Sequence, residues 1–352
     1  MDQGITETIG VDLGDRYSTY CVLDHGTGEE RERGRLRTTP TAFEGFFRGR
    51  SGARTVVEVG THSPWVSRIL QRHCAEVHVA NARELHFIFR NLRKGDDKDP
   101  ERLARVGRMD PKLLRPIQHR SQERQHDLVR IRARAALVST RTELVNTLRG
   151  LVKSVGGRLP RKDASAIRHD FCKELPAQLH DALAPLVLTI EFLNDEIKRY
   201  DRKIEEVAKS EYPETRVLTQ VDSVGTLTAL TFLLTLEDPN RFAHSRDVGP
   251  FLGVTPKRDQ SGEVDKQLRI TKAGDAALRT LLVQCAQRIL GRFGKDCDLK
   301  RYGERIAARG GKIAKRKAVI AVARKLAVLL HHLWKTGEIY DPNHNLTTAR
   351  VA

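Results

Sequence analysis

The sequence predicts three consecutive parts: an α/β domain over residues 1–110, a helical coiled coil over 111–212, and a mainly helical domain over 213–345. Short strand patterns alternate with helical patterns in the first part. The second part has apolar residues at alternating steps of three and four, and the third has short helical patterns broken by glycine turns. A chain of 352 residues is long enough for this division.

The pattern of the N-terminal part predicts three strands followed by alternating helices and strands. A tight turn at Gly14 and Asp15 joins the first two strand patterns, which indicates a hairpin. The expected strands cover residues 5–11, 17–23, 31–38, 55–59 and 77–80, and the expected helices begin at Pro40, Pro64 and Ala82. This order of elements is typical of a ribonuclease H-like fold.

The middle part has long helical periodicity. Between Leu183 and Val207, apolar residues recur at alternating steps of three and four, which predicts a coiled coil. An earlier helix, from Leu128 to Val145, has the same rhythm through Ala135 and Thr142, and a break at residues 156–160 separates the two. Such stripes do not name their partner, so pairing within one chain and pairing with a second copy both stay open.

The net charge of +17, from 62 Lys and Arg against 45 Asp and Glu, favours a nucleic-acid partner. Basic residues are densest between Arg288 and Lys325, where thirteen Lys and Arg face three acids. A loop over residues 310–317 is expected to contact phosphate there, ahead of an apolar helix over 319–334. The cations of this loop are Lys312, Lys315, Arg316 and Lys317.

Cysteine usage and hydropathy indicate a cytoplasmic protein. The five cysteines include no C-x-x-C pair, so neither a disulfide framework nor a zinc site is expected. The N-terminus lacks a basic and then apolar leader, and no run approaches the ~18 apolar residues of a membrane span. We therefore expect a cytoplasmic protein that has no membrane partner.

Four carboxylates mark a candidate metal site. Asp12 in IGVDLG and Glu58 in VVEVG stand at or near the ends of apolar strand patterns, and Asp96 and Asp99 in KGDDKD stand three apart at an apparent helix start. Oxygen ligands from separate elements suit Mg²⁺, with Mn²⁺ as a substitute, and such an ion also takes substrate phosphate. Asp97 is an alternative to either member of the last pair, although only positions i and i+3 share a helix face.

With these motifs in view, the chain resembles the DEDD transposases of insertion-sequence family one-ten. The four acids match the metal-binding acids of that family, and Lys94 precedes the last pair as it does there. The C-terminal half repeats the ordered blocks of the family, which are DPNRF (238–242), FLGVTP (251–256), SG (261–262), ITKAGD (270–275) and LR (278–279). Two positions depart from its usual pattern, Gly95 for Thr or Ser and Pro100 for Ala.

The resemblance implies a RuvC-like N-terminal domain, a C-terminal transposase domain, and an enzyme that cleaves and rejoins DNA by Mg²⁺-dependent phosphoryl transfer. Ser261 is the implied nucleophile, which would form a phosphoserine link to DNA. Arg269, Lys272 and Arg279 are candidates for holding the phosphate, since cations near a transferring phosphoryl group offset its charge. The resemblance further implies a homo-oligomer, dimer or tetramer, acting on element ends and target DNA with a structured guide RNA from the element.

Three other functions stay open at this point. A metal-dependent junction-resolving nuclease would use water in place of Ser261. An actin-like ATPase or sugar kinase is suggested by the IGVDLG loop at residues 9–14, but it would need further glycine-rich phosphate and adenosine loops, and the sequence has no convincing ones. A non-catalytic nucleic-acid-binding protein would not need the four acids.

Overall fold

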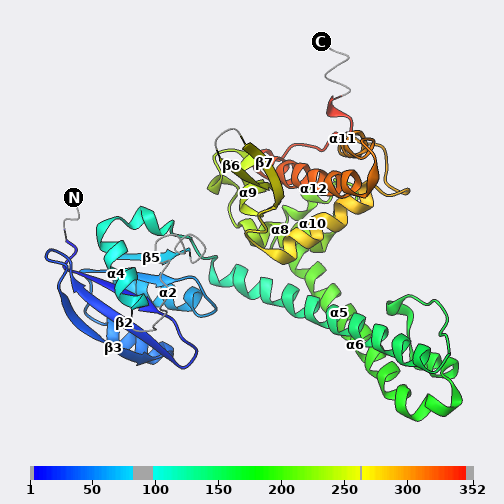
Figure 1. Cartoon of the computed structure of the whole chain (residues 1–352), viewed down its shortest axis with the longest axis horizontal. Coiled ribbons are helices and arrows are strands. Elements are labelled where there is room, and N and C mark those ends of the chain that lie inside the picture. The colour runs from blue at the N-terminus through cyan, green and yellow to red at the C-terminus, as the bar shows by residue number, and fades with distance from the viewer. Residues whose placement is uncertain (1–3, 82–97, 262–263, 346–352) are drawn as a thin grey trace. The chain divides into compact units, whose positions relative to one another are not determined.

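The computed structural model describes residues 4–81, 98–261 and 264–345, and it divides the chain into two compact units, Met1–Arg120 and Ser121–Ala352 (Figure 1). Each unit has its own apolar core. The N-terminal unit is a mixed sheet with helices, and the C-terminal unit is mostly helical. None of the helices in the described part has the length and apolarity that a membrane span requires.

Five strands form the N-terminal sheet in the order β3-β2-β1-β4-β5. They are β1 (Glu7–Asp12), β2 (Tyr17–Asp24), β3 (Glu30–Arg37), β4 (Ala53–Glu58) and β5 (Glu76–Ala80). The first three strands are antiparallel neighbours, whereas β4 pairs parallel with β1 and β5 pairs parallel with β4. All five expected strands are confirmed, with their ends shifted by one or two residues.

Three helices of this unit are described: α1 (Pro40–Phe47), α2 (Ser63–His73) and α4 (Asp99–Met109). The helices expected at Pro40 and Pro64 are confirmed, because proline suits the first turn of a helix, where its missing N–H is not needed. Thr39 also caps α1 by accepting the backbone N–H of the first turn. The helix expected from Ala82 lies outside the described residues.

The sheet is covered on both faces. Phe43 of α1 and Val66 of α2 belong to the same core cluster as Ile9, so these two helices lie on one face. Leu103 of α4 packs with Val56 of β4 in a separate cluster on the other face. Alternation along each strand explains the division, since neighbouring side chains of a strand point to opposite faces.

Helix α4 touches β1 through main chain at Gly10. A Cβ atom on Gly10 would lie 1.9 Å from the carbonyl oxygen of Pro100 and 2.6 Å from the nitrogen of Ala104. At its other end, α4 donates from Arg108 Nε to the carbonyl oxygen of His25, 2.7 Å away, in the turn that follows β2. The helix therefore runs antiparallel to β1, with its first residues at the carboxyl end of that strand.

Gly10→Ala is expected to destabilise the N-terminal unit by about 1–3 kcal/mol, because the methyl group has no room and must push α4 away from β1. Urea unfolding of the full chain, followed by circular dichroism, measures the change. Gly45→Ala is the matched control, since a Cβ there meets nothing within 4 Å and lies in helix α1. An unfolding midpoint of Gly10→Ala equal to that of the wild type would contradict the close contact.

The C-terminal unit begins with two long helices, α5 (Gln122–Ser154) and α6 (His180–Ser210). They pair with each other within the chain: Leu128 of α5 shares a core cluster with Val207 of α6, and Val145 shares another with Ile190. This pairing is antiparallel, because the start of one helix meets the end of the other (Figure 1). The two stripes expected from the sequence thus have an intramolecular partner.

The middle of this helical hairpin is polar. Arg134 Nε donates to an oxygen of Asp201 at 2.6 Å, and Arg141 Nη1 donates to Asn194 Oδ1 at 2.8 Å. The apolar stripe expected on α5 is wrong at Ala135, which is exposed, as is Thr142. Long polar side chains reach across the hairpin here, and the small residues of α5 consequently face solvent.

The rest of the unit is a helical body with one β-hairpin. Its helices are α7 (Thr215–Leu218), α8 (Thr226–Leu236), α9 (Val248–Phe251), α10 (Ala276–Ile289), α11 (Asp298–Ala307) and α12 (Gly311–Thr336), and its strands are β6 (Pro256–Ser261) and β7 (Val264–Ile270). Helix α8 is buried along most of its length, and its Phe232 lies in the same core as Leu282 of α10 and Leu326 of α12.

The expected phosphate-binding loop over residues 310–317 is wrong in its conformation. Helix α12 begins at Gly311, so the basic residues occupy its first two turns. Gly310 has a φ of 87° and ends the preceding turn, which lets the chain reverse directly into the helix. Buried Ala314 and Ala318 then anchor the inner side of these turns.

Candidate functional site

Asp12 and Glu58 lie on neighbouring strands, at the end of the N-terminal sheet where the parallel strands β1 and β4 finish. Each is the last residue of its strand, and β1 and β4 are parallel neighbours with Val11 opposite Val57. The next register position therefore places the two acids opposite each other, on strands about 4.8 Å apart. Both side chains are half-buried and share the face of Gly10, against which α4 lies.

Asp99 reaches the same edge from α4. It is the first residue of the helix, one position before Pro100, whose carbonyl lies against Gly10. Its side chain is 45% exposed and 3.3 Å from Arg102 Nη1. Asp99 therefore begins its helix at the end of the sheet where β1 and β4 finish, which is where open α/β sheets usually bind ligands.

A nearby acid on α4, Glu101, is hydrogen-bonded to two arginines. Glu101 accepts from Arg33 at 2.7 Å and from Arg105 at 2.8 Å. These hydrogen bonds, that of Arg33 first, hold the pKa of the Glu101 carboxyl below its usual range. Glu101 therefore stays an ionised partner of the arginines and is not a spare ligand.

A pair of side chains near these acids, His62 and Asp15, was not predicted from the sequence. His62, four residues after Glu58, lies with its Nε2 3.7 Å from Asp15, three residues after Asp12. Its Nδ1 accepts the indole N–H of Trp65 at 3.1 Å, so the neutral ring carries its proton on Nε2. Only the folding of two loops over one sheet edge brings these side chains together.

The donor chemistry of the edge fits a hard divalent cation, because carboxylate oxygens are the ligands that Mg²⁺ and Mn²⁺ prefer. Asp96 lies outside the described residues, as does its alternative Asp97. Among the residues that are described, no three acidic, histidine or cysteine side chains are grouped closely enough to hold a metal ion.

Ser261 belongs to the other unit and ends strand β6. It pairs with Val264 at the turn of the β6–β7 hairpin, so it stands at the tip. The hairpin is a two-stranded sheet by itself, and its described side chains are exposed except Ile270. Arg258 of β6 ties the strands together by donating to both carboxylate oxygens of Asp265, at 2.9 and 2.7 Å.

The three candidate phosphate ligands lie near the base of this hairpin. Arg269 is exposed on β7, and Lys272 follows the strand with a φ of 56°, donating its backbone N–H to the Gly253 carbonyl at 3.1 Å. Arg279 Nη1 donates to the carbonyls of Leu252 at 3.0 Å and Ala273 at 2.7 Å. Arg279 therefore braces the loops at the hairpin base.

The four cations of the α12 start are all exposed and form a basic surface. Lys312, Lys315, Arg316 and Lys317 lie on the first two turns, opposite the buried alanines. The N-terminus of a helix favours negative charge, so a cluster of cations there is unfavourable without an anionic partner. A nucleic-acid phosphate would relieve that repulsion.

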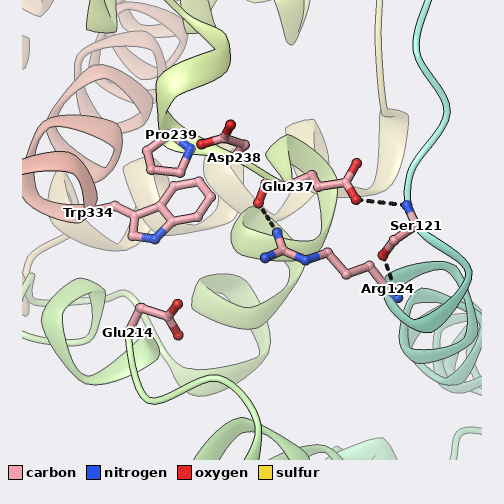
Figure 2. Close-up of a pocket in the computed structure, with 7 residues that line it drawn as sticks. All are labelled: Ser121, Arg124, Glu214, Glu237, Asp238, Pro239 and Trp334. Atoms are coloured by element: carbon pink, nitrogen blue, oxygen red, sulfur yellow. Dashed lines mark hydrogen bonds between the residues drawn. The ribbon is translucent and has the colours of Figure 1, made fainter.

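A surface pocket of about 600 Å³ lies elsewhere in the C-terminal unit, lined by Glu237, Asp238 and Trp334 among others (Figure 2). Glu237 accepts the backbone N–H of Ser121 at 2.7 Å, and its carbonyl accepts from Arg124. These bonds join the start of α5 to the end of α8. The pocket contains none of the site residues predicted from the sequence.

An α/β unit with carboxylates at the end of its parallel strands, together with a helical unit that exposes a cationic surface, suits an enzyme that processes nucleic acids. Comparison with known families makes this specific. A DEDD transposase model of the IS110 type matches residues 9–156, and the model described as "Transposase IS116/IS110/IS902 family" matches residues 215–303. The chain belongs to the IS110 family of DNA transposases.

Individual relatives agree with the family match. The transposase for insertion sequence element IS1111A of Coxiella burnetii is 30% identical over 259 residues, which cover 70% of this chain and 68% of the relative. The transposase for element IS1328 of Yersinia enterocolitica is 26% identical over 81% of this chain and 84% of its own length. The resemblance predicted from the motifs is confirmed, and the ATPase and non-catalytic alternatives are not supported.

Proposed function

We propose that this transposase cleaves and rejoins DNA by phosphoryl transfer, with Ser261 as nucleophile and with Mg²⁺, or Mn²⁺ in its place, held by Asp12, Glu58, Asp96 and Asp99. The adjacency of Asp12 and Glu58 at the carboxyl edge, with the α4 start beside them, carries the proposal. A protein–DNA adduct on Ser261 that survives denaturation tests it.

The N-terminal unit is proposed to be ribonuclease H-like, of the RuvC type. Support comes from the strand order β3-β2-β1-β4-β5, with three antiparallel strands followed by two parallel ones. The placement of acids at the ends of β1 and β4 agrees with a metal site in such a fold.

In the proposed reaction, the Ser261 oxygen attacks a DNA phosphorus. A serine–phosphate ester forms as a phosphorus–oxygen bond to deoxyribose breaks, and the deoxyribose oxygen leaves as a hydroxyl. Rejoining reverses this exchange with another strand's hydroxyl, so one ester replaces another and no ATP is needed. A bound divalent cation would stabilise the attacking and leaving oxygens. Arg269 and Lys272, which lie near the base of the hairpin that carries Ser261, would offset phosphate charge.

A homo-oligomer, dimer or tetramer, is part of the proposal, with the acids of one copy completing the serine site of another. The acids and the serine lie in different units of the chain, which is compatible with sharing between copies. Helix α6 also exposes Leu188 and Phe192, one turn apart, as an apolar contact for a second copy. The remaining proposed partners are element-end and target DNA, a structured guide RNA, and a location on the prokaryotic nucleoid.

The α12 start is proposed to contact nucleic-acid backbone and not base edges. Charge reversal of Arg316 and Lys317 together is expected to weaken binding to all sequences alike. The slope of log affinity against log salt should fall by about 1.8 for a duplex, since each lost phosphate contact releases fewer counterions. Filter binding at several salt concentrations measures both effects.

The control for this variant reverses Lys203 and Lys209, two exposed cations of α6, and makes the same change in net charge. It should leave the salt slope near that of the wild type. Equal slopes for the two double variants would assign the α12 surface to solvent.

A further inference from the structure

The loop between α10 and α11 carries a strongly exposed aromatic ring. Phe293 is 82% exposed, more than Phe192 of α6 at 63%. Full burial of such a side chain stabilises a fold by about 1.5–3 kcal/mol, and most of that stabilisation is absent here because the ring is exposed. Isolated exposed apolar residues are common, so the surroundings of the ring decide its meaning.

The loop holds Phe293 in a fixed position. The Gly294 N–H donates to the Gly291 carbonyl at 3.0 Å, and Lys300 Nζ donates to the Gly294 carbonyl at 2.7 Å. A Cβ at position 294 would lie 2.0 Å from the carbonyl oxygen of Ile289, so only glycine fits there. An aromatic ring on such a support loses little conformational freedom when a ligand stacks on it.

The charges around the ring favour an anionic partner. The Arg292 guanidinium lies over the Phe293 ring, 4.3 Å from its centroid. Arg288, at the end of α10, is also exposed, and within the described part of the chain neither arginine forms an ion pair with a carboxylate. An apolar protein surface would have to desolvate these two guanidinium groups, whereas phosphates would pair with them.

We propose that Phe293 is a stacking site for an unpaired base of single-stranded DNA, with Arg292 over one face of the ring, the base on the other, and the exposed Arg288 as a partner for an adjoining phosphate. Nucleobases stack on aromatic rings irrespective of sequence, and cationic groups beside the ring follow the backbone. Paired bases are already stacked in the duplex and offer no free face. Strand exchange by a transposase produces unpaired DNA, so the site adds strand capture to the proposed cleavage chemistry.

The test compares binding of the full chain to a labelled single-stranded DNA oligonucleotide and to its duplex. Phe293→Ala is expected to weaken single-strand binding by about 5- to 150-fold, the range given by stacking of one base. Duplex binding should stay within about twofold of the wild type. Phe293→Leu should behave like the alanine variant, because an aliphatic side chain keeps apolarity but not the ring face.

Phe293→Trp supplies a direct readout. An indole stacks at least as well, so single-strand affinity should be retained, and the oligonucleotide should quench more tryptophan fluorescence than in the wild type, whose only tryptophans are Trp65 and Trp334. Ile339→Ala is the control, because it removes an apolar side chain that is exposed to a similar degree, 87%, and has no part in the proposed contacts.

Three results would overturn the assignment. They are wild-type single-strand affinity in both Phe293→Ala and Phe293→Leu, equal losses for Phe293→Ala and Ile339→Ala, and equal losses on single strand and duplex. An RNA oligonucleotide of the same sequence separates the two nucleic acids. A loss confined to RNA would place RNA, and not DNA, on the ring.

Discussion

Ser261→Ala is expected to abolish DNA cleavage and the covalent protein–DNA adduct together. Alanine has no oxygen with which to form the phosphate ester, so no intermediate accumulates. Wild-type protein incubated with element-end DNA and Mg²⁺ should give an adduct that survives denaturation in detergent, and peptide mapping should locate the DNA on Ser261. Gel electrophoresis of labelled DNA measures adduct and cleavage in one experiment.

Two variants sharpen this result. Gln260→Ala changes the exposed residue that precedes Ser261 and should keep the adduct. This control separates loss of the nucleophile from disruption of the β6–β7 hairpin. Ser261→Cys should retain little activity, because a thiolate is a soft nucleophile that matches phosphorus and Mg²⁺ poorly. Cleavage by Ser261→Ala, with no adduct in the wild type, would make water the nucleophile and favour the junction-resolving nuclease.

Asp12→Ala is expected to eliminate cleavage and adduct while DNA binding persists, and Glu58→Ala and Asp99→Ala should do the same. These carboxylates are proposed to hold the cation and are not part of the cationic surface. Removal of a negative charge should, if anything, strengthen electrostatic binding slightly. Cleavage assays in Mg²⁺ and in Mn²⁺, with binding measured on the same preparations, separate the two properties.

Glu29→Ala is the control for the acid variants, because it removes one exposed carboxylate from the same unit. It should cleave like the wild type. Comparing Asp96→Ala with Asp97→Ala decides which of the two is a ligand, and loss of activity is expected for Asp96 alone. Full cleavage by Asp12→Ala in Mg²⁺ would exclude the proposed metal site.

The N-terminal sheet was predictable from local signals. The Gly14 and Asp15 turn set the first hairpin, and Pro40 and Pro64 marked helix starts, since each of these residues restricts the backbone by itself. The adjacency of Asp12 and Glu58 could not be predicted from local signals. It depends on the parallel register of β1 and β4, which pairs strands more than forty residues apart and leaves no trace in either segment.

The β6–β7 hairpin was not predicted because β6 (PKRDQS) shows no apolar alternation. Its partner β7 has few apolar residues, of which Leu268 is half exposed, and the strands are joined by the backbone ladder and the Arg258–Asp265 ion pair. A sheet without a core has no apolar face for the sequence to reveal. The start of α12 was also predicted wrongly. Gly310 and Gly311 suggested a loop, whereas the helix begins at Gly311.

The contact of α4 with β1 at Gly10 also bears on how this protein tolerates sequence change. Main chain meets main chain there, so the close approach of α4 to β1 requires that position 10 carry no side chain. We expect substitutions of neighbouring side chains to change the spacing of Asp12 and Asp99 less than a larger residue at position 10 does. We therefore expect sequence change to be tolerated at the surrounding positions but not at Gly10, although Gly10 carries no functional group.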